Sequence, residues 1–114
     1  MARLTDPDIL AKFHAALSQW RFTGYITWKP IARQWVEQNL EGWTTRSVGE
    51  QLFRHFAAGG DIDQTRETRP EWSEHPYHYD FRVEIGGRLL YIETLLISDD
   101  PDDPMVHVVS IHDA

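Results

Sequence analysis

Hydrophobic and polar residues alternate along residues 77–85, and this is the clearest pattern in the chain. Aromatic and aliphatic side chains occupy the odd positions and polar side chains the even ones, the period of a strand with one buried face. Gly86-Gly87 then supplies a two-residue turn, and residues 88–97 return as a second strand. The sequence therefore predicts a β-hairpin with a core face and a polar face.

The two-residue turn determines which residues of the hairpin lie opposite each other. On the polar face it places Asp80 opposite Glu93 and Arg82 opposite Tyr91. Two carboxylates directly across a strand pair repel each other unless a proton, an arginine or a metal lies between them, so we expect one of the acids to titrate above its usual value. The expected pairs on the core face are Val83–Leu90, Phe81–Ile92, Tyr79–Thr94 and Tyr77–Leu96.

Helical periodicity precedes the hairpin, and further extended segments surround it. We predict helices at about 5–22, 30–40 and 45–57, a short extended segment at 25–28, an edge strand within 61–67, and a last strand at 105–112 that is apolar on both faces and therefore interior. This order predicts a single α+β domain, residues 1–114, in which three N-terminal helices pack on one face of a C-terminal antiparallel sheet of three to four strands. The expected core residues are Leu10, Phe13, Leu17, Trp20, Trp35, Leu52, Phe56, Tyr79, Phe81, Val83, Leu90 and Ile92.

The composition is that of a globular protein without disulfide bonds. Hydrophobic residues make up 41% of the 114 positions, and the absence of cysteine excludes disulfides and thiolate chemistry. No apolar run approaches the ~20 residues of a membrane span, and the first residues lack the basic start and apolar block of a signal peptide. We expect a soluble cytoplasmic protein that does not contact a membrane.

The net charge of −7 is unevenly distributed along the chain. Residues 1–60 have a net charge of +2, whereas residues 61–114 contain four arginines and thirteen acids, a net charge of −9. An acidic half of this kind is a poor general surface for polyanions. It would suit a cation, a basic partner or solvation alone.

Side chains capable of chemistry gather on the polar face of the predicted hairpin. The last strand adds to this face in one of two registers, because the length of the preceding turn does not decide between them. One register contributes Ser110 and His112, and the other contributes His107 and Val109. In the first register His112 could join the hairpin residues and combine an acid near neutral pH with a base and a cation. The face itself carries His78, Asp80, Arg82, Glu84, Tyr91 and Glu93.

A simpler interpretation of this face is that it has no chemical role. Arg82 would then neutralise Asp80 and Glu93 on a solvated surface. A metal site is a third interpretation, since two histidines and two carboxylates could bind zinc, manganese or iron. However, the six histidines form no H-x-H or H-E-x-x-H spacing, and the acidic turn at 98–104 lacks the spacing of a calcium loop. We therefore predict neither a metal nor another cofactor.

The helical half offers two features typical of nucleic-acid binding. The helices at 30–40 and 45–57 could form a helix-turn-helix, although two helices that only pack in the core are the alternative. Its recognition helix would present Arg46, Gln51, Arg54 and His55.

Tryptophans beside basic residues could stack bases if they were exposed. Trp20 and Trp35 lie on apolar faces and are expected in the core, whereas Trp28 and Trp43 lie at element ends and could do either. Trp72, in the proline-bracketed loop before the hairpin, could act as a lid over the sheet.

Helices followed by a four-stranded antiparallel sheet with a histidine close to its end form a recognisable layout. It is carried here by Tyr79-Asp80-Phe81-Arg82, Tyr91-Ile92-Glu93-Thr94 and Val109-Ser110-Ile111-His112-Asp113. Over residues 60–113 it resembles the RelE-like toxins and the wider barnase and colicin type of ribonuclease. Such enzymes cleave RNA without a metal, the neighbouring 2′-hydroxyl attacking the phosphate. The resemblance implies Glu93 as general base, Arg82 as phosphate clamp and His112 as general acid.

The sequence thus favours a metal-independent, toxin-type RNase-like hydrolase acting on RNA. Its predicted catalytic residues are Arg82, Glu93 and His112, and its predicted substrate-binding residues are His78, Asp80, Tyr91 and Trp72. The alternative is a non-catalytic acidic binding module, such as an antitoxin, immunity or regulatory protein, for a basic protein partner.

Overall fold

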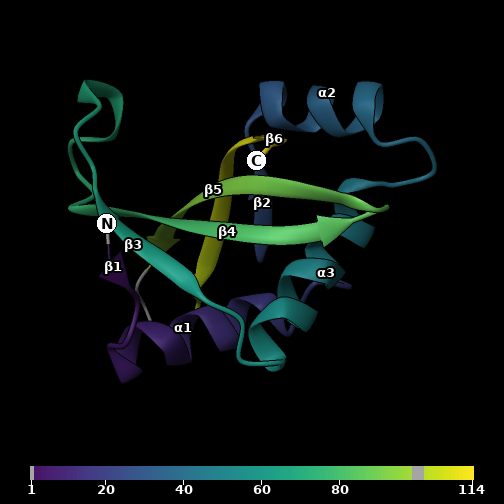
Figure 1. The fold of residues 1–114 in the computed structure, drawn as a ribbon. Helices are drawn as coiled ribbons and strands as arrows, with labels where there is room; N and C mark the ends of the chain where they lie inside the picture. Colours follow the sequence, from purple (N-terminus) through teal and green to yellow (C-terminus); the bar gives the residue numbers. More distant parts are fainter. Residues whose placement is uncertain (1, 99–101) are drawn as a thin grey trace.

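The computed structural model describes residues 2–98 and 102–114 and shows an α+β architecture (Figure 1). The strands are β1 (Ala2–Arg3), β2 (Ile26–Trp28), β3 (Ile62–Arg66), β4 (Tyr77–Ile85), β5 (Arg88–Ser98) and β6 (Met105–Asp113). The helices are α1 (Pro7–Leu17), α2 (Pro30–Asn39) and α3 (Thr45–Ala57), and a short 3₁₀ helix, η1 (Pro70–Trp72), lies between β3 and β4. The strands form a single sheet in the order β1-β3-β4-β5-β6-β2.

The β4–β5 hairpin has the predicted register. Its ladder runs from the pair Tyr79–Thr94 to the end of the hairpin and includes the Asp80–Glu93 pair, so the core and polar faces are assigned correctly. Gly86 and Gly87 have φ values of +61° and +79°, and two consecutive positive φ angles are typical of a type I′ turn. The expected pair Tyr77–Leu96 lies beyond this ladder, where Tyr77 pairs with β3 instead.

The second and third helices match their predicted ranges, but the first is shorter than expected. The amides of Gln19 and Trp20 donate to the carbonyls of Ala16 and Leu17, a tightening of the chain that ends α1 at Leu17. Helix α3 begins after Thr44, whose hydroxyl accepts from the Ser47 amide while the Ser47 hydroxyl accepts from the Thr44 amide. Thr44 and Ser47 therefore form a capping box at the start of α3.

The sheet is larger than predicted, and it is mixed rather than antiparallel. β2 pairs in parallel with β6, with Thr27 opposite His107, and β1 adds two residues beside β3. Both added strands are too short to show a periodic pattern, which is why the sequence did not predict their pairing. The interior position of β6 is confirmed, because it lies between β5 and β2.

One hydrophobic core joins all three helices to a single face of this sheet. Helices α1 and α3 lie below the β4–β5 hairpin in Figure 1 and α2 lies above it beside β6, because the sheet twists strongly between β4 and β6. Of the expected core residues, Phe13, Leu17, Leu52, Tyr79, Phe81, Val83, Leu90 and Ile92 are buried. Leu10, Trp35 and Phe56 are half-buried against the core, whereas Trp20 is half-buried outside this cluster and lines a surface pocket.

Strand β6 contains a bulge, at which the side chains that face the polar side change from odd-numbered to even-numbered residues. The bulge determines the register of β6 with β5. Ser110 lies opposite Glu93, but the next pairs along β5 are Thr94 with residue 108 and Leu95 with His107, so Val109 is an extra residue. Each of the two registers left open by the sequence is therefore correct on one side of the bulge. As a result Ser110 and His107 contribute to the same polar face.

No helix among residues 2–98 and 102–114 is both long and apolar enough to cross a membrane. The acidic turn expected at 98–104 lies partly outside the described residues.

Candidate active site on the polar face of the sheet

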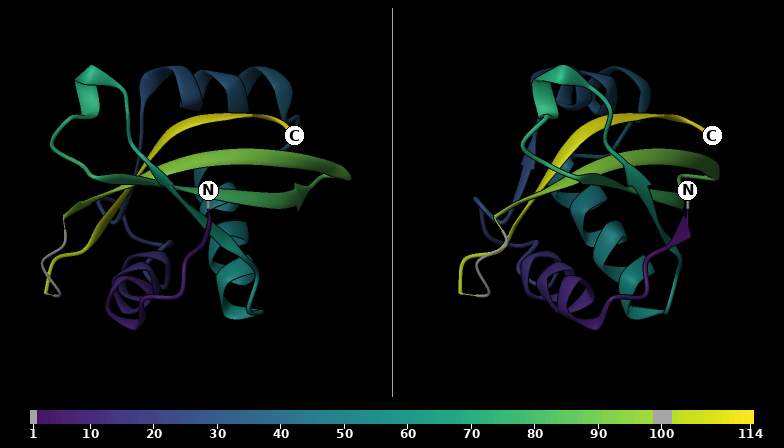
Figure 2. Two further views of the ribbon diagram at one scale, coloured as in Figure 1. Left: turned by 60° about the vertical axis from the view of Figure 1, so that its left-hand side comes forward. Right: turned by 90° about the vertical axis from the view of Figure 1, so that its left-hand side faces the viewer.

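The polar face of the sheet lies on the side away from α1 and α3. Both views in Figure 2 show the β3–β4 connection, including η1, standing above this side, while α1 and α3 lie below the sheet. Strand alternation places His78 and Asp80 of β4 on this face beside Glu93 of β5. The connection therefore covers the strand segment that carries these three residues.

A histidine between two carboxylates forms the centre of the site. The Nδ1 atom of His78 lies 3.3 Å from Glu93 Oε2 and 3.5 Å from Asp80 Oδ1. An Nδ1–H directed at these carboxylates would stabilise the tautomer whose lone pair is on Nε2. Only 14% of the His78 side chain is exposed, so the ring is held in a partly enclosed position.

Asp80 is the most deeply buried ionisable residue in this cluster, with 1% of its surface exposed. Its Oδ2 atom accepts hydrogen bonds from Tyr91 Oη at 2.6 Å and from Thr65 Oγ1 at 3.2 Å. Burial raises the pKa of Asp80, and the Tyr91 hydrogen bond opposes this rise. The direction agrees with the expectation for the Asp80–Glu93 pair, although the main cause is loss of hydration and the charge of Glu93 contributes less.

Arg69 supplies the positive charge that the two cross-strand acids require. Its Nη2 atom lies 2.8 Å from Glu67 Oε2 and 3.0 Å from Glu93 Oε2, so one guanidinium joins the loop to β5. The sequence interpretation assigned this role to Arg82 and missed Arg69, because a loop residue has no predicted position relative to the sheet. The Arg69 hydrogen bond lowers the pKa of the Glu67 carboxyl to about 2.

The Glu67–Arg69 pair should make the fold sensitive to acid. Because the pKa of Glu67 is lowered on folding, its stabilising contribution is present above the unfolded value of about 4.5 and is lost as pH falls towards 2. The Glu67 side chain is only 1% exposed and that of Arg69 is 33% exposed, so water screens the pair only in part. We expect the pair to contribute about 2–3 kcal/mol to the free energy of unfolding at pH 7. Urea unfolding at pH 7 and pH 3 should show that Glu67→Gln destabilises the protein at pH 7 by this amount and by much less at pH 3.

Glu50→Gln is the matched control, because Glu50 forms an exposed pair with Arg54 within α3. Its effect should stay below about 0.5 kcal/mol at both pH values. A Glu67→Gln effect of the same size at pH 3 as at pH 7 would contradict an ionic origin.

Trp72 and His107 extend the site towards β6. The centroids of their rings lie 5.9 Å apart, so the indole lies beside the imidazole that β6 contributes to the polar face. The Nδ1 atom of His107 forms a 2.8 Å hydrogen bond with Thr27 Oγ1 of β2, and burial lowers the pKa of His107. The Trp72 Nε1 atom is buried and has no hydrogen-bond partner in the described structure.

The structure places Arg82 and His112 around Tyr91. Arg82 Nη2 lies 2.8 Å from Asp63 Oδ2, and its guanidinium carbon lies 5.9 Å from the centre of the Tyr91 ring. The His112 ring stacks on Tyr91 with centroids 5.2 Å apart, as the first of the two registers implied. Glu93, the third predicted catalytic residue, contacts His78 and Arg69.

Three side chains of this site could together hold a metal ion. Donor atoms of His78, Asp80 and Glu93 all lie within 4.8 Å of one another. Ligands about 2.1 Å from a tetrahedral ion are separated by about 3.4 Å, close to the distances of 3.3 and 3.5 Å measured from His78 Nδ1. Spacing along the chain could not reveal this set, because the pairing of β4 with β5 brings it together.

The candidate recognition helix makes contacts within the protein. Arg54 pairs with Glu50, and His55 Nε2 lies 2.7 Å from the Asp61 carbonyl oxygen. Helices α2 and α3 both contribute buried residues to the common core. This arrangement agrees with the alternative that the two helices pack rather than read DNA.

Comparisons with protein-family models, with curated proteins and with solved structures each found no match to this chain.

Proposed function

We propose that the polar sheet face is the active site of a metal-independent hydrolase that cleaves RNA, with His78 and Arg69 as its reactive groups. The observation that supports this most is the position of two unsatisfied atoms. Asp80 Oδ1 and Trp72 Nε1 are the two buried side-chain polar atoms without a hydrogen-bond partner among the described residues. A buried unpaired polar atom costs about 1–3 kcal/mol, and such groups are typical of functional sites.

His78 is the general base of the proposed reaction. The Glu93 carboxylate holds its Nδ1 atom at 3.3 Å, and Nε2 takes the proton from the 2′-hydroxyl of the RNA. The 2′-oxygen then forms a bond to phosphorus while the bond from phosphorus to the 5′-oxygen breaks. The departing 5′-oxygen takes a proton from water, and the products are a 2′,3′-cyclic phosphate and a 5′-hydroxyl.

Arg69 stabilises the negative charge that develops on the phosphate. Its guanidinium is one-third exposed while it remains bound to Glu93, so it can reach both the cluster and a substrate. The roles therefore differ from those implied by the resemblance: Glu93 becomes a positioning residue, and Arg82 and His112 lie at the edge of the site. Trp72 offers part of an aromatic face on which a base could stack.

The test is cleavage of single-stranded RNA by the purified protein in the presence of EDTA at low salt. We expect fragments that end in a cyclic phosphate, because the proposed attack comes from the 2′-hydroxyl. Replacing the cleavage-site nucleotide with its 2′-deoxy form should abolish the cut. Cleavage that survives this replacement, or the absence of any cleavage in EDTA, would contradict the proposal.

A divalent-cation site is the second candidate, and Asp80 Oδ1 is the observation that favours it. This oxygen is buried, has no hydrogen-bond partner in the part of the chain that the structure describes, and lies 3.5 Å from the His78 nitrogen that would be the neighbouring ligand. We rank this function second because Arg69 already neutralises Glu93, and a cation beside Arg69 would experience its repulsion.

Binding of Mn²⁺ or Zn²⁺ would stabilise the fold. At 1 mM metal and a dissociation constant of about 10 μM, the gain is about 2.7 kcal/mol, or several degrees in Tm. Asp80→Asn should remove this shift, while Asp63→Asn, a carboxylate paired with Arg82 outside the cluster, should keep it. A shift of the same size in Asp80→Asn, or none in the wild type, would contradict a site at this cluster.

The acidic binding module remains a prediction. Two results together would identify it. The wild type would bind a basic protein partner without cleaving RNA, and this binding would be lost when Asp80, Glu84 and Glu93 are neutralised together.

A further inference from the structure

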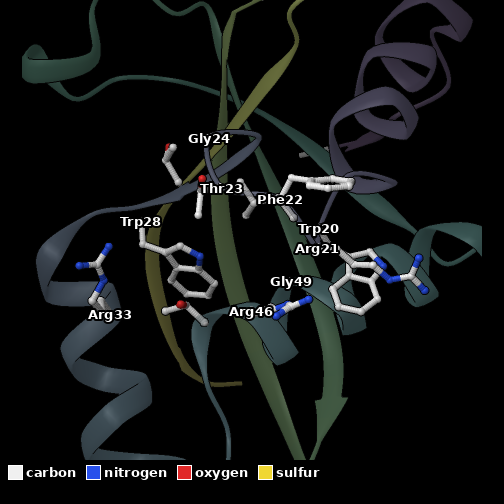
Figure 3. Close-up of a pocket in the computed structure, with 12 residues that line it drawn as sticks. Trp20, Arg21, Phe22, Thr23, Gly24, Trp28, Arg33, Arg46 and Gly49 are labelled. Atoms are coloured by element: carbon white, nitrogen blue, oxygen red, sulfur yellow. The ribbon is translucent and has the colours of Figure 1, made fainter.

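A second site lies at the outer edge of the sheet, away from the histidine–carboxylate cluster. It is a pocket of about 310 Å³ bordered by the turn after α1, by β2, and by the first turns of α2 and α3 (Figure 3). Gly49 of α3 forms part of its wall, where a Cβ atom would lie 3.2 Å from the Ile26 side chain. The helix and the edge strand therefore approach closely at this point.

The pocket collects arginines that have no carboxylate partner. Arg3, Arg54, Arg69, Arg82 and Arg88 each form an ion pair with an acid. Four arginines in the described structure form none, and three of these, Arg21, Arg33 and Arg46, line this pocket. Among the described residues no aspartate or glutamate lines it, although the chain contains 18 acids and only 11 basic residues. Three unneutralised guanidinium groups around one cavity are an electrostatic arrangement that suits an anion.

Aromatic rings stand between these charges. The guanidinium carbons of Arg21 and Arg46 lie 4.9 and 5.9 Å from the centre of the Trp20 ring. In Figure 3, Arg46 extends between Trp28 and Trp20, and Arg33 lies beside Trp28. Both indoles are half-buried and line the cavity, so each can present part of a flat face to a ligand. Trp20 was expected in the core, and its position here is explained by the end of α1 at Leu17.

We propose that this pocket binds one nucleotide unit, that is, a phosphate joined to a flat heterocyclic base. Arg33 and Arg46 would hold the phosphate, because guanidinium groups form bidentate hydrogen bonds with phosphate oxygens. The base would stack on Trp28, since stacking on an aromatic side chain accepts any base. The volume lies at the small end of the range of about 300–1,000 Å³ for ligand sites, which suits a single unit of this size.

The pocket is connected to the polar face through one pair of residues. Thr27 lines the pocket and forms the 2.8 Å hydrogen bond to His107, whose ring lies against Trp72. The nucleotide unit could belong to a free nucleotide or to a strand that continues towards the polar face. Binding here does not depend on cleavage at His78, so the two proposals can fail separately.

Isothermal titration with adenosine 5′-monophosphate and with a 2′-deoxy trinucleotide tests the proposal at low salt. The double variant Arg33→Gln/Arg46→Gln should bind both ligands with an affinity at least about tenfold lower, because each lost guanidinium removes a charge-assisted contact. Trp28→Leu should lower the affinity for the nucleotide by about tenfold but leave the affinity for ribose 5-phosphate, which has no base to stack, unchanged. Arg66→Gln is the matched control, since Arg66 is the fourth arginine without an acid partner and lies on β3, outside the pocket.

The two sources of the nucleotide give different results in the same experiment. Equal affinities for the mononucleotide and the trinucleotide would identify a free nucleotide as the ligand. A clearly higher affinity for the trinucleotide would identify a strand. Either result supports the site if the double variant no longer binds the ligand. No binding of either ligand, equal weakening by Arg66→Gln, or ribose 5-phosphate binding as tightly as the nucleotide would overturn the proposal. Circular dichroism of the double variant separates lost binding from lost folding, and the exposure of Arg33 and Arg46 makes a folding defect unexpected.

Discussion

Replacing His78 by alanine should reduce EDTA-resistant RNA cleavage by about 10²-fold or more while leaving the fold intact. The expected loss is that of a general base, which typically contributes 10²–10⁴-fold to the rate. His78 is suited to this role because two carboxylates lie on its Nδ1 side at 3.3 and 3.5 Å, which leaves Nε2 for the substrate. The measurement is the single-turnover rate on a labelled RNA, with folding checked by circular dichroism.

The controls for this prediction are the residues that the sequence placed in the same role. His112→Ala should lower the rate by less than about tenfold, because His112 is exposed and stacks on Tyr91 at the rim of the site. Glu93→Gln should give an intermediate loss and a displaced pH–rate profile, as expected for a group that positions the base. If His112→Ala abolishes cleavage and His78→Ala does not, the roles implied by the resemblance are correct and ours are wrong.

Replacing Phe81 by alanine should destabilise the protein by about 3–5 kcal/mol, which is a large part of the stability of a domain of this size. Phe81 lies in the middle of β4, is 0% exposed, and has ring centroids 6.0 Å from Phe13 and 5.8 Å from His55. Its removal leaves a cavity between the sheet and two helices that rigid secondary structure cannot fill completely. The measurement is urea-induced unfolding followed by tryptophan fluorescence.

Phe22→Ala is the matched control, because it removes the same side chain from a position that is 63% exposed. Its effect should stay within about 0.5 kcal/mol. A loss below about 1 kcal/mol for Phe81→Ala would show that this face of the hairpin is not the core.

The hairpin was predictable from sequence because two local signals agree. The odd-numbered residues from Tyr79 to Val83 are apolar, and Gly86-Gly87 permits the two positive φ angles of a type I′ turn, so only one register buries the apolar set. The Asp80–Glu93 pair follows from that register. Local periodicity could not predict the bulge at Val109, because an extra residue on one strand is specified by packing against its neighbours.

The residues that contact the acids of the site could not be predicted either, because these contacts also depend on tertiary packing. Arg69 belongs to a connection without periodicity, and its distance from Glu93 depends on how that connection folds back over the sheet. The three residues Ile26–Trp28 were expected to be extended, but nothing local indicates a parallel partner so far along the chain. With β2 in place the Trp20 and Trp28 rings border one pocket, so the sequence missed that site as well.

The parallel pairing of β2 with β6 has a consequence for the order of events during synthesis. Thr27 and His107 are 80 residues apart, so the edge strand that borders the arginine pocket has no partner until the last strand emerges. Contacts of such long sequence separation slow folding, and an unpaired strand in a nascent chain is exposed to association with other chains. The amino-terminal helices can thus form early on the ribosome, but β2, which borders the arginine pocket, can pair with β6 only after translation has passed residue 108.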